Sequence, residues 1–318
     1  MPLLTTMSIF SLVMLSILEN ISPVFLVILL GFMSRRMGFL PDIFISSANR
    51  LVYFIAIPLL VYNEISKGTF SESFDLWQIG GTFLAVASVG TAAYLLARIL
   101  KLAPGRTATF VQTSYHGNLG YVGLAVVFYT LGPEGRGAAS VLAGFLILFQ
   151  NVLSIGMFTF VASGDQKVDQ RAIGKFLGNP IILATLLGLL SSAVGVRVPH
   201  FLERSFDIVG DMALPLALLI IGGSLKTAPG KRIQLVGFST VFKLLLLPLT
   251  GFLLFRAMGV NPTQAETALI LLASPSATVT YVMASEMGGE PELAAAAVTI
   301  STIISIVTYT LWIAVMGG

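Results

Sequence analysis

Hydrophobic segments long enough to cross a membrane dominate the sequence and leave it few alternatives. A transmembrane helix needs about 20 consecutive, mostly apolar residues. We count ten such segments, at approximately 12–34, 42–65, 75–99, 106–131, 136–162, 173–195, 200–225, 233–257, 264–287 and 292–316. Charged residues make up 10% of the chain, whereas soluble domains carry about 25%. The sequence therefore predicts an all-α integral membrane protein with ten transmembrane helices.

The two halves of the chain share landmarks at the same spacing. Pro23 and Pro58 are 35 residues apart, as are Pro180 and Pro215, and a glycine follows the first proline of each pair by eight residues. Prolines and glycines are common enough in membrane helices to coincide, but a duplication explains the spacing with one offset. Because five spans per repeat is an odd number, the repeats would have opposite orientations, as in secondary transporters. We therefore predict two inverted repeats, at 1–165 and 172–318.

Lysine and arginine predict the orientation of these spans. Placing the N-terminus outside leaves eleven of them in cytoplasmic connections and five in external ones, as the positive-inside rule requires. Both termini are therefore expected on the extracytoplasmic side of the plasma (inner) membrane. These connections also account for the net charge of +3, so we expect the lipid bilayer as a partner and no nucleic acid.

Polar residues interrupt the fourth predicted span. Thr107–Leu131 is otherwise apolar, yet it holds His116 and Asn118 at its middle, together with three glycines that include Gly117. Burying unpaired polar groups in hydrocarbon is costly, and irregular backbone at membrane depth occurs only where it lines a cavity or is buried in protein. We therefore expect this helix to be broken and to contribute half of a substrate site. Asn118 can alternatively serve only as a helix cap.

The ninth predicted span carries the second half of this site. Leu271–Met283 has Pro275 at its middle, flanked by Ser274 and Ser276, and a proline there removes a backbone hydrogen bond. If the broken helices 4 and 9 cross, the positive ends of their half-helix dipoles share one cavity, which favours an anion. The predicted substrate-binding residues from these two spans are His116, Gly117, Asn118, Ser274, Pro275 and Ser276.

Other polar residues within spans are candidates for ion coupling. Asp211 and Lys243 are intramembrane charges, His116 can relay protons, and Gln150 with Asn151 can face the crossing. Each has a structural alternative: an ion pair, a neutral buried histidine, or hydrogen bonds between helices. Sodium sites usually include carboxylates, and neither break region holds Asp or Glu. We therefore expect coupling to H⁺, or uniport driven by the membrane potential, rather than coupling to Na⁺, with no resident metal or other cofactor.

A family resemblance rests on motifs that extend over nearly the whole chain. They are Asn49-Arg50-Leu51-Val52, Ile57-Pro58-Leu59-Leu60, Asn118–Gly123, Asn179-Pro180, Leu214–Leu218, Gly222–Leu225, Lys243-Leu244 with Pro248, Ser274-Pro275 and Ser301-Thr302. On these residues the chain resembles the auxin efflux carrier family, which includes plant PIN carriers and bacterial malate or malonate permeases. It lacks the long hydrophilic central loop of the plant carriers, as expected of a short bacterial-type member.

The resemblance implies a fold related to bile-acid symporters and sodium/proton antiporters. In that fold a scaffold domain, spans 1, 2, 6 and 7, often forms a homodimer, and a transport domain, spans 3–5 and 8–10, moves against it as an elevator. The resemblance places Asn118 and Pro275 at the substrate site, with Asn179 as a weaker candidate near the end of a span.

These observations together predict a secondary transporter for small organic anions such as malate, malonate or auxin-like carboxylates. The main alternative is a sodium- or proton-coupled symporter or antiporter of the bile-acid symporter type. A channel would share the broken helices without alternating access. An intramembrane enzyme is not expected, because the sequence has no HExxH or GxSxG motif and no cysteine.

Overall fold

The computed structural model describes residue 19 and residues 22–67, 75–162, 178, 180–196, 198–225 and 232–316. The regular secondary structure within these residues is helical. Six helical stretches within these residues are long and apolar enough to cross a membrane. They are Asp42–Lys67, Leu76–Ile99, Gly135–Ala162, His200–Ser224, Ile233–Met258 and Pro291–Met316. The expectation of an all-helical membrane protein is confirmed at this level.

The elements follow one another with short connections. The first described helix occupies residues 22–36. After it come α2 (Asp42–Leu51), η1 (Val52–Ala56), α3 (Ile57–Lys67), α5 (Leu76–Ile99), α6 (Pro104–Tyr115), η2 (Leu119–Gly123), α7 (Leu124–Thr130), α8 (Gly132–Met157) and η3 (Phe158–Ala162). The second half contains α10 (Pro180–Val194), α11 (His200–Asp211), α12 (Ala213–Ser224), α13 (Ile233–Val241), η4 (Phe242–Leu246), α14 (Leu247–Met258), α15 (Pro262–Leu272), α16 (Val279–Glu286) and α17 (Pro291–Met316).

Two π-helical turns have a common cause in the sequence. The turns η1 and η4 each end two residues before a proline, Pro58 and Pro248 respectively. A proline inside a helix clashes with the carbonyl group four residues earlier and cannot donate to it, and a wider turn relieves this conflict. At Pro248 the carbonyl left without its helical donor is that of Leu244, which accepts a hydrogen bond from the Trp312 indole at 2.9 Å. The widened helix is thus satisfied by its neighbour.

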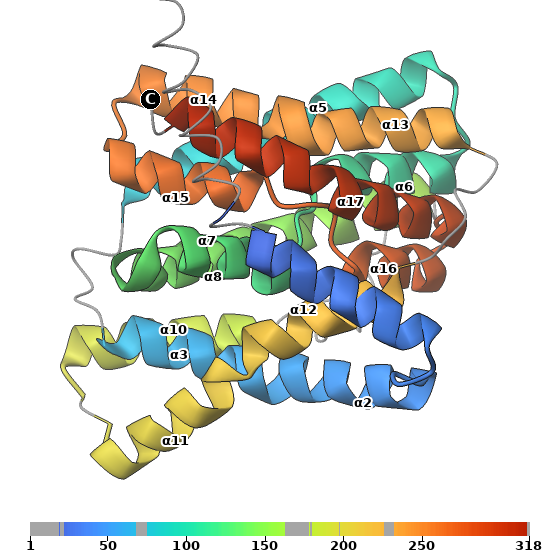
Figure 1. The fold of residues 1–318 in the computed structure, drawn as a ribbon. Coiled ribbons are helices and arrows are strands. Elements are labelled where there is room, and N and C mark those ends of the chain that lie inside the picture. Colours follow the sequence, from blue (N-terminus) through green and yellow to red (C-terminus); the bar gives the residue numbers. More distant parts are fainter. Residues whose placement is uncertain are drawn as a thin grey trace, which may run out of the picture.

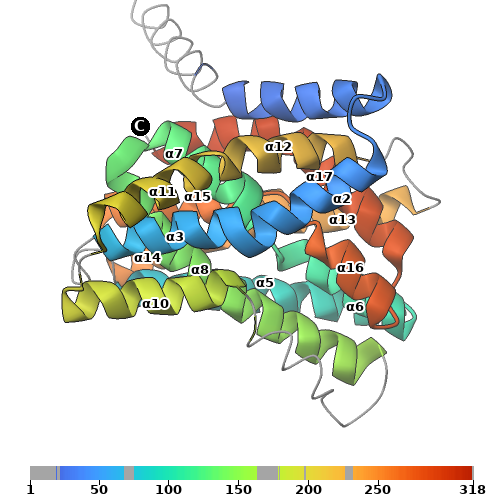
Figure 2. The ribbon, with the colours of Figure 1, turned by 90° about the horizontal axis from the view of Figure 1, so that it is seen from below.

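The helices fall into two groups on either side of α7 and α8 (Figure 1). In that view α2, α3, α10 and α11 lie below, while α5, α13, α14 and α15 lie above. Helix 22–36 runs beside α12, as the view turned by 90° also shows (Figure 2). Small residues allow this contact, because a Cβ on Gly31 would lie 2.2 Å from the Leu219 carbonyl oxygen, and one on Gly222 would lie 1.9 Å from that of Ile28.

An ion cluster fixes the connection between α16 and α17. Glu290 accepts from Arg106 at 2.8 Å and from Arg232 at 2.9 Å, and so joins the first turn of α6 to the residue before α13. Its backbone N–H also donates to the Thr109 hydroxyl at 2.9 Å. These contacts connect the start of α6 to the segment after α16, at the ends of the two broken helices that lie away from the breaks.

Candidate functional site

The fourth predicted span is interrupted between Tyr115 and Leu119. Its first half, α6, ends at Tyr115, and the chain is extended at His116, with φ −79° and ψ 101°. The Gln150 side chain on α8 supports both sides of the break, because its oxygen accepts from the Gly117 N–H at 3.1 Å and its nitrogen donates to the Tyr115 carbonyl at 3.2 Å. Gln150 therefore replaces backbone hydrogen bonds that the break removes.

The second interruption, between α15 and α16, pairs directly with the first. The Asn118 N–H donates to the Pro275 carbonyl at 2.7 Å, and the Ala277 N–H donates to the His116 carbonyl at 2.9 Å. These two bonds form a single antiparallel bridge between Gly117 and Ser276. Two segments far apart in sequence thus cross and satisfy each other's backbone at the centre of the protein.

Ser276 is committed to holding this crossing together. Its N–H donates to the Ser301 hydroxyl at 3.0 Å, and its own hydroxyl donates to the Thr113 carbonyl at 2.8 Å. The side chain is fully buried. Ser276 therefore joins α17 and α6 to the second break, and its hydroxyl hydrogen is not free for a ligand.

Asn118, in contrast, keeps an unused donor. Its backbone carbonyl begins the next half-helix by accepting from the N–H groups of Val122 and Gly123, while its side chain makes no capping hydrogen bond. The side chain is 6% exposed, and its Nδ2 has no hydrogen-bond partner in the described structure. The Ser274 hydroxyl, fully buried, also lacks a partner there. Six other buried side-chain atoms also lack partners among the described residues, but these two belong to the residues of the crossing itself, where a ligand can complete their bonding.

Lys243 brings a positive charge to the same place. Its side chain is fully buried, and its ammonium donates to the Leu272 carbonyl at 2.6 Å, at the C-terminus of α15 where the helix dipole is negative. A Cβ added to Gly117 would lie 3.2 Å from Lys243 Nζ and 2.3 Å from Ser274 Oγ. Lysine and serine therefore close around Gly117, and only glycine leaves them room.

His116 faces α8 rather than the unused donors. Its Nδ1 lies 3.0 Å from the Ser154 hydroxyl, which also lies 2.9 Å from the Tyr115 hydroxyl. The Ser154 hydrogen is committed to the Gln150 carbonyl at 2.7 Å. Tyr115 and His116 must then both donate to Ser154, which fixes the histidine proton on Nδ1. Sequence reasoning did not identify Ser154, because a serine in a hydrophobic helix has no local pattern that reveals its partner.

The remaining candidate residues are not brought to the crossing. Asn151 is partly exposed on α8 and makes no hydrogen bond to a described residue. Asp211 is exposed at the end of α11. Asn179 lies outside the described residues. Two residues of the family motifs, Tyr121 and Asn49, form a contact that the sequence did not predict. The Tyr121 hydroxyl donates to the Asn49 side chain at 2.8 Å and so joins η2 to α2.

The chemistry of the crossing suits an anion better than a cation. An amide donor, a hydroxyl, an ammonium group and the N-terminus of the second half-helix belong to the crossing, and each of them favours negative charge. The negative end of α15 at the same place is already paired with the Lys243 ammonium. No cluster of His, Asp and Glu that could hold a metal ion occurs among the described residues.

Comparison with known proteins identifies similar membrane transport proteins. A family model described as "Membrane transport protein" covers residues 16–313. A protein of Rhizobium meliloti named "Putative malonate transporter" is 27% identical over 301 residues, which are 91% of this chain and 92% of that protein. An uncharacterized transporter of Methanocaldococcus jannaschii is 24% identical, over 91% of this chain and 95% of that one.

A more distant likeness reaches the plant carriers. "Auxin efflux carrier component 3a" of Oryza sativa is 27% identical over 152 residues, which are 45% of this chain and 24% of the rice protein. These relatives are named as transporters, not as enzymes. The family model, which extends over nearly the whole chain, decides the assignment: this protein belongs to the auxin efflux carrier family of membrane transport proteins.

Proposed function

We propose that this protein is a secondary carrier that moves small organic anions across the membrane by an elevator-type alternating-access cycle. The observation that carries the proposal is the buried Asn118 amide nitrogen, which has no partner in the described structure. Asn118 lies at the crossing of two broken helices and follows Gly117, where an added Cβ would lie 3.2 Å from the buried ammonium of Lys243. A carboxylate placed there would accept from Asn118 and be attracted by the lysine and the half-helix N-terminus.

The proposed architecture has ten spans in two inverted repeats. Spans 1, 2, 6 and 7 form a scaffold that pairs with a second copy, and spans 3–5 and 8–10 form the moving transport domain. The grouping of helices on either side of α7 and α8 supports this division (Figure 1). The Tyr121–Asn49 hydrogen bond would then join the two domains and break as they slide.

The proposed substrates are small mono- and dicarboxylates such as malonate, malate or an auxin-like acid. The relative whose name mentions malonate is aligned over 92% of its length, and the rice auxin carrier over only 24% of its length. This difference in coverage favours a small dicarboxylate.

Lys243 also bears on the driving force. A sodium ion would need several oxygen ligands, but Lys243 already occupies the Leu272 carbonyl, while Gln150 occupies that of Tyr115. We propose that the fixed ammonium stands where a coupling cation would otherwise be needed, and that a proton gradient or the membrane potential drives transport. The proposed location is the plasma (inner) membrane with both termini outside.

The test uses purified protein in liposomes, loaded with unlabelled malonate, malate or indole-acetate and supplied with a trace of the labelled acid. A carrier shows counterflow, in which the label transiently accumulates, whereas a channel does not. Replacing Asn118 with Ala removes a donor to a charged group, worth about 1.5–3 kcal/mol, so affinity should fall by roughly 10- to 150-fold. Asn118→Asp keeps the volume but repels the anion, and should lower affinity further.

Asn261→Ala provides the matched control. Asn261 caps α15 through the Thr263 N–H at 3.0 Å, so its loss should cost stability of about 1 kcal/mol and leave affinity unchanged. Absence of counterflow with every carboxylate would exclude the anion-carrier proposal. Equal affinities of the Asn118 and Asn261 variants would remove Asn118 from the site.

A further inference from the structure

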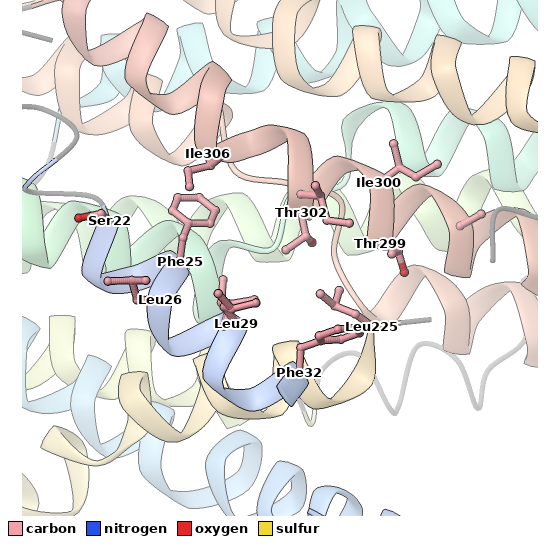
Figure 3. A pocket seen from close by; sticks show the side chains of 13 residues that line it. Ser22, Phe25, Leu26, Leu29, Phe32, Leu225, Thr299, Ile300, Thr302 and Ile306 are labelled. Carbon is pink, nitrogen blue, oxygen red and sulfur yellow. The ribbon is translucent and has the colours of Figure 1, made fainter. Parts of the chain in front are cut away.

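A half-open apolar groove runs between helix 22–36 and α17 (Figure 3). Its volume is about 560 Å³. Phe25, Ile28, Ala296 and Thr302 form a floor that is at most 9% exposed, whereas the rim is open, with Leu29 50% exposed. Figure 3 shows Phe25 opposite Ile306 at one end, and Phe32 beside Leu225 and Thr299 at the other.

The surface of the groove suits an alkyl chain and not a polar substrate. The hydroxyl of Thr302 is committed to the Val298 carbonyl at 2.7 Å, and that of Ser22 points to the Glu19 carbonyl at 3.4 Å. A carboxylate in the groove would find no vacant donor on either of them. Apolar contact is therefore the main interaction that the groove offers.

The length of the groove matches one leaflet of a bilayer. On α17 its lining extends from Ala296 to Ile306, and on the first helix from Ser22 to Phe32. Each stretch has eleven residues, which at about 1.5 Å per residue is roughly 15 Å, or half of the hydrocarbon core of about 30 Å. Phe32 and Ala296 lie near the ends of the predicted spans 12–34 and 292–316, while Ser22 and Ile306 lie near the middles of these predicted spans. On that placement the groove covers one leaflet only.

A positive charge stands at the end of the groove where a lipid headgroup would lie. Arg36 is exposed, and its guanidinium lies 5.3 Å from the ring centre of Phe32, which lines the groove. Its neighbour Arg35 is committed to Asp42. Arg36 has no carboxylate partner among the described residues. Glu292, one turn before Ala296 on α17, is exposed at the same end of the groove. Because this carboxylate would repel other negative groups, the positive charge of Arg36 is matched to a single phosphate group and not to the whole headgroup.

We propose that this groove binds a phospholipid of the bilayer, with one acyl chain between helix 22–36 and α17 and the phosphate at Arg36. The apolar floor and the length of the groove match one acyl chain, and the arginine at its end matches the phosphate group. In the proposed transport cycle the two helices belong to different domains, so the lipid would lie between the moving parts. The binding site itself does not depend on that cycle.

The test uses the full chain in nanodiscs and a reporter inside the groove. The protein has no cysteine, so Leu29→Cys can carry a single bimane fluorophore, which brominated acyl chains quench on contact. Brominated phosphatidylglycerol is the probe, and a brominated galactolipid without phosphate is the comparison. Leu253→Cys on α14, at a residue that is 58% exposed and lines neither described pocket, reports ordinary contact with bulk lipid.

Quenching at Leu29 should reach half its maximum at about a fivefold lower fraction of phosphatidylglycerol than at Leu253, since one arginine near an anionic surface contributes about 1 kcal/mol. Arg36→Gln should remove this preference, and the galactolipid should show none. Arg98→Gln is the matched control, because each arginine lies over the aromatic ring one turn before it. The distance to the ring centre is 5.9 Å from Arg98 to Tyr94 and 5.3 Å from Arg36 to Phe32. Arg98→Gln should change nothing.

Four results would overturn the proposal. Equal quenching curves at the two reporters would show that the Leu29 reporter contacts ordinary bulk lipid. A Leu29 quenching curve that is unchanged by Arg36→Gln would show the same. A Leu29 reporter shielded from every lipid at high protein density would mean a second copy of the chain. Relief of quenching by malonate or indole-acetate would mean that the groove holds the transported acid.

Discussion

Adding one methyl group at Gly117 tests the geometry of the crossing directly. Gly117 has a negative φ, so alanine is allowed by the backbone and only the surroundings oppose it. The new Cβ would lie 2.3 Å from Ser274 Oγ, 3.2 Å from Lys243 Nζ and 3.3 Å from Lys243 Cε. The first distance is far below van der Waals contact, so the serine or the bridge between the breaks must move.

Overpacking of this kind costs about 1–3 kcal/mol. We therefore expect Gly117→Ala to lower the melting temperature in detergent by roughly 4–8 °C, taking about 2 kcal/mol and 2–4 °C for each kcal/mol. Substrate affinity should fall as well, because the displaced atoms include the lysine ammonium. The measurement is a melting curve with and without a fixed excess of carboxylate, since the stabilisation of the folded state by a bound ligand increases with the logarithm of the ligand concentration divided by Kd.

A second substitution separates this contact from general damage. Ser274→Ala removes the hydroxyl that would lie closest to the new Cβ. Because that hydroxyl has no partner in the described structure, the single variant should leave the melting temperature of the ligand-free protein nearly unchanged. The double variant Gly117→Ala/Ser274→Ala should recover at least half of the lost stability, because the closest contact is gone and the two lysine contacts are longer. Gly237→Ala on α13, where a Cβ meets nothing within 4 Å, should cost nothing. The geometry is wrong if Gly117→Ala behaves like Gly237→Ala, or if the second substitution restores nothing.

Three further variants test contacts around the site. Gln150→Leu leaves two backbone groups at the first break unpaired, so melting should fall by the equivalent of about 2–6 kcal/mol; an unchanged melting curve contradicts that bracing role. Tyr121→Phe removes the bond to Asn49 and should change the transport rate by about 2- to 12-fold while equilibrium affinity holds; a change confined to affinity would place Tyr121 in the site instead. Glu290→Gln should cost about 1 kcal/mol and lose its effect in high salt; salt-independent destabilisation would mean that packing, not charge, holds this connection.

The sequence could point to the two crossing stretches because the bilayer makes polar interruptions conspicuous. Asn118 and Pro275 have no place in a lipid-facing helix, and the structure joins them by a backbone hydrogen bond. Between them, hydrophobic length predicts the three long helical stretches Gly135–Ala162, His200–Ser224 and Ile233–Met258, which the structure contains. What the sequence could not give is which side chain completes which backbone group, because a carbonyl such as that of Leu272 has no residue-specific signal.

Lys243 and His116 illustrate that difference. A lysine in a hydrophobic span suggests a carboxylate partner, yet Lys243 binds the end of a helix. His116 attracts attention as a histidine in the middle of a predicted span, yet its proton is held by a serine 38 residues later. In both cases the partner lies on a helix whose placement depends on the whole fold, so no local pattern could identify it.

The bridge between the two breaks also has a consequence for how the protein is made. Pro275 follows Asn118 by 157 residues, and a ribosome adds about 5–20 residues each second. The first break therefore enters the membrane roughly 8–30 s before the backbone that pairs with it has been synthesised. During that time the Asn118 N–H and the His116 carbonyl depend on water or on the insertion machinery. Slow or interrupted synthesis of the second half should expose the nascent chain to quality-control proteolysis at this point.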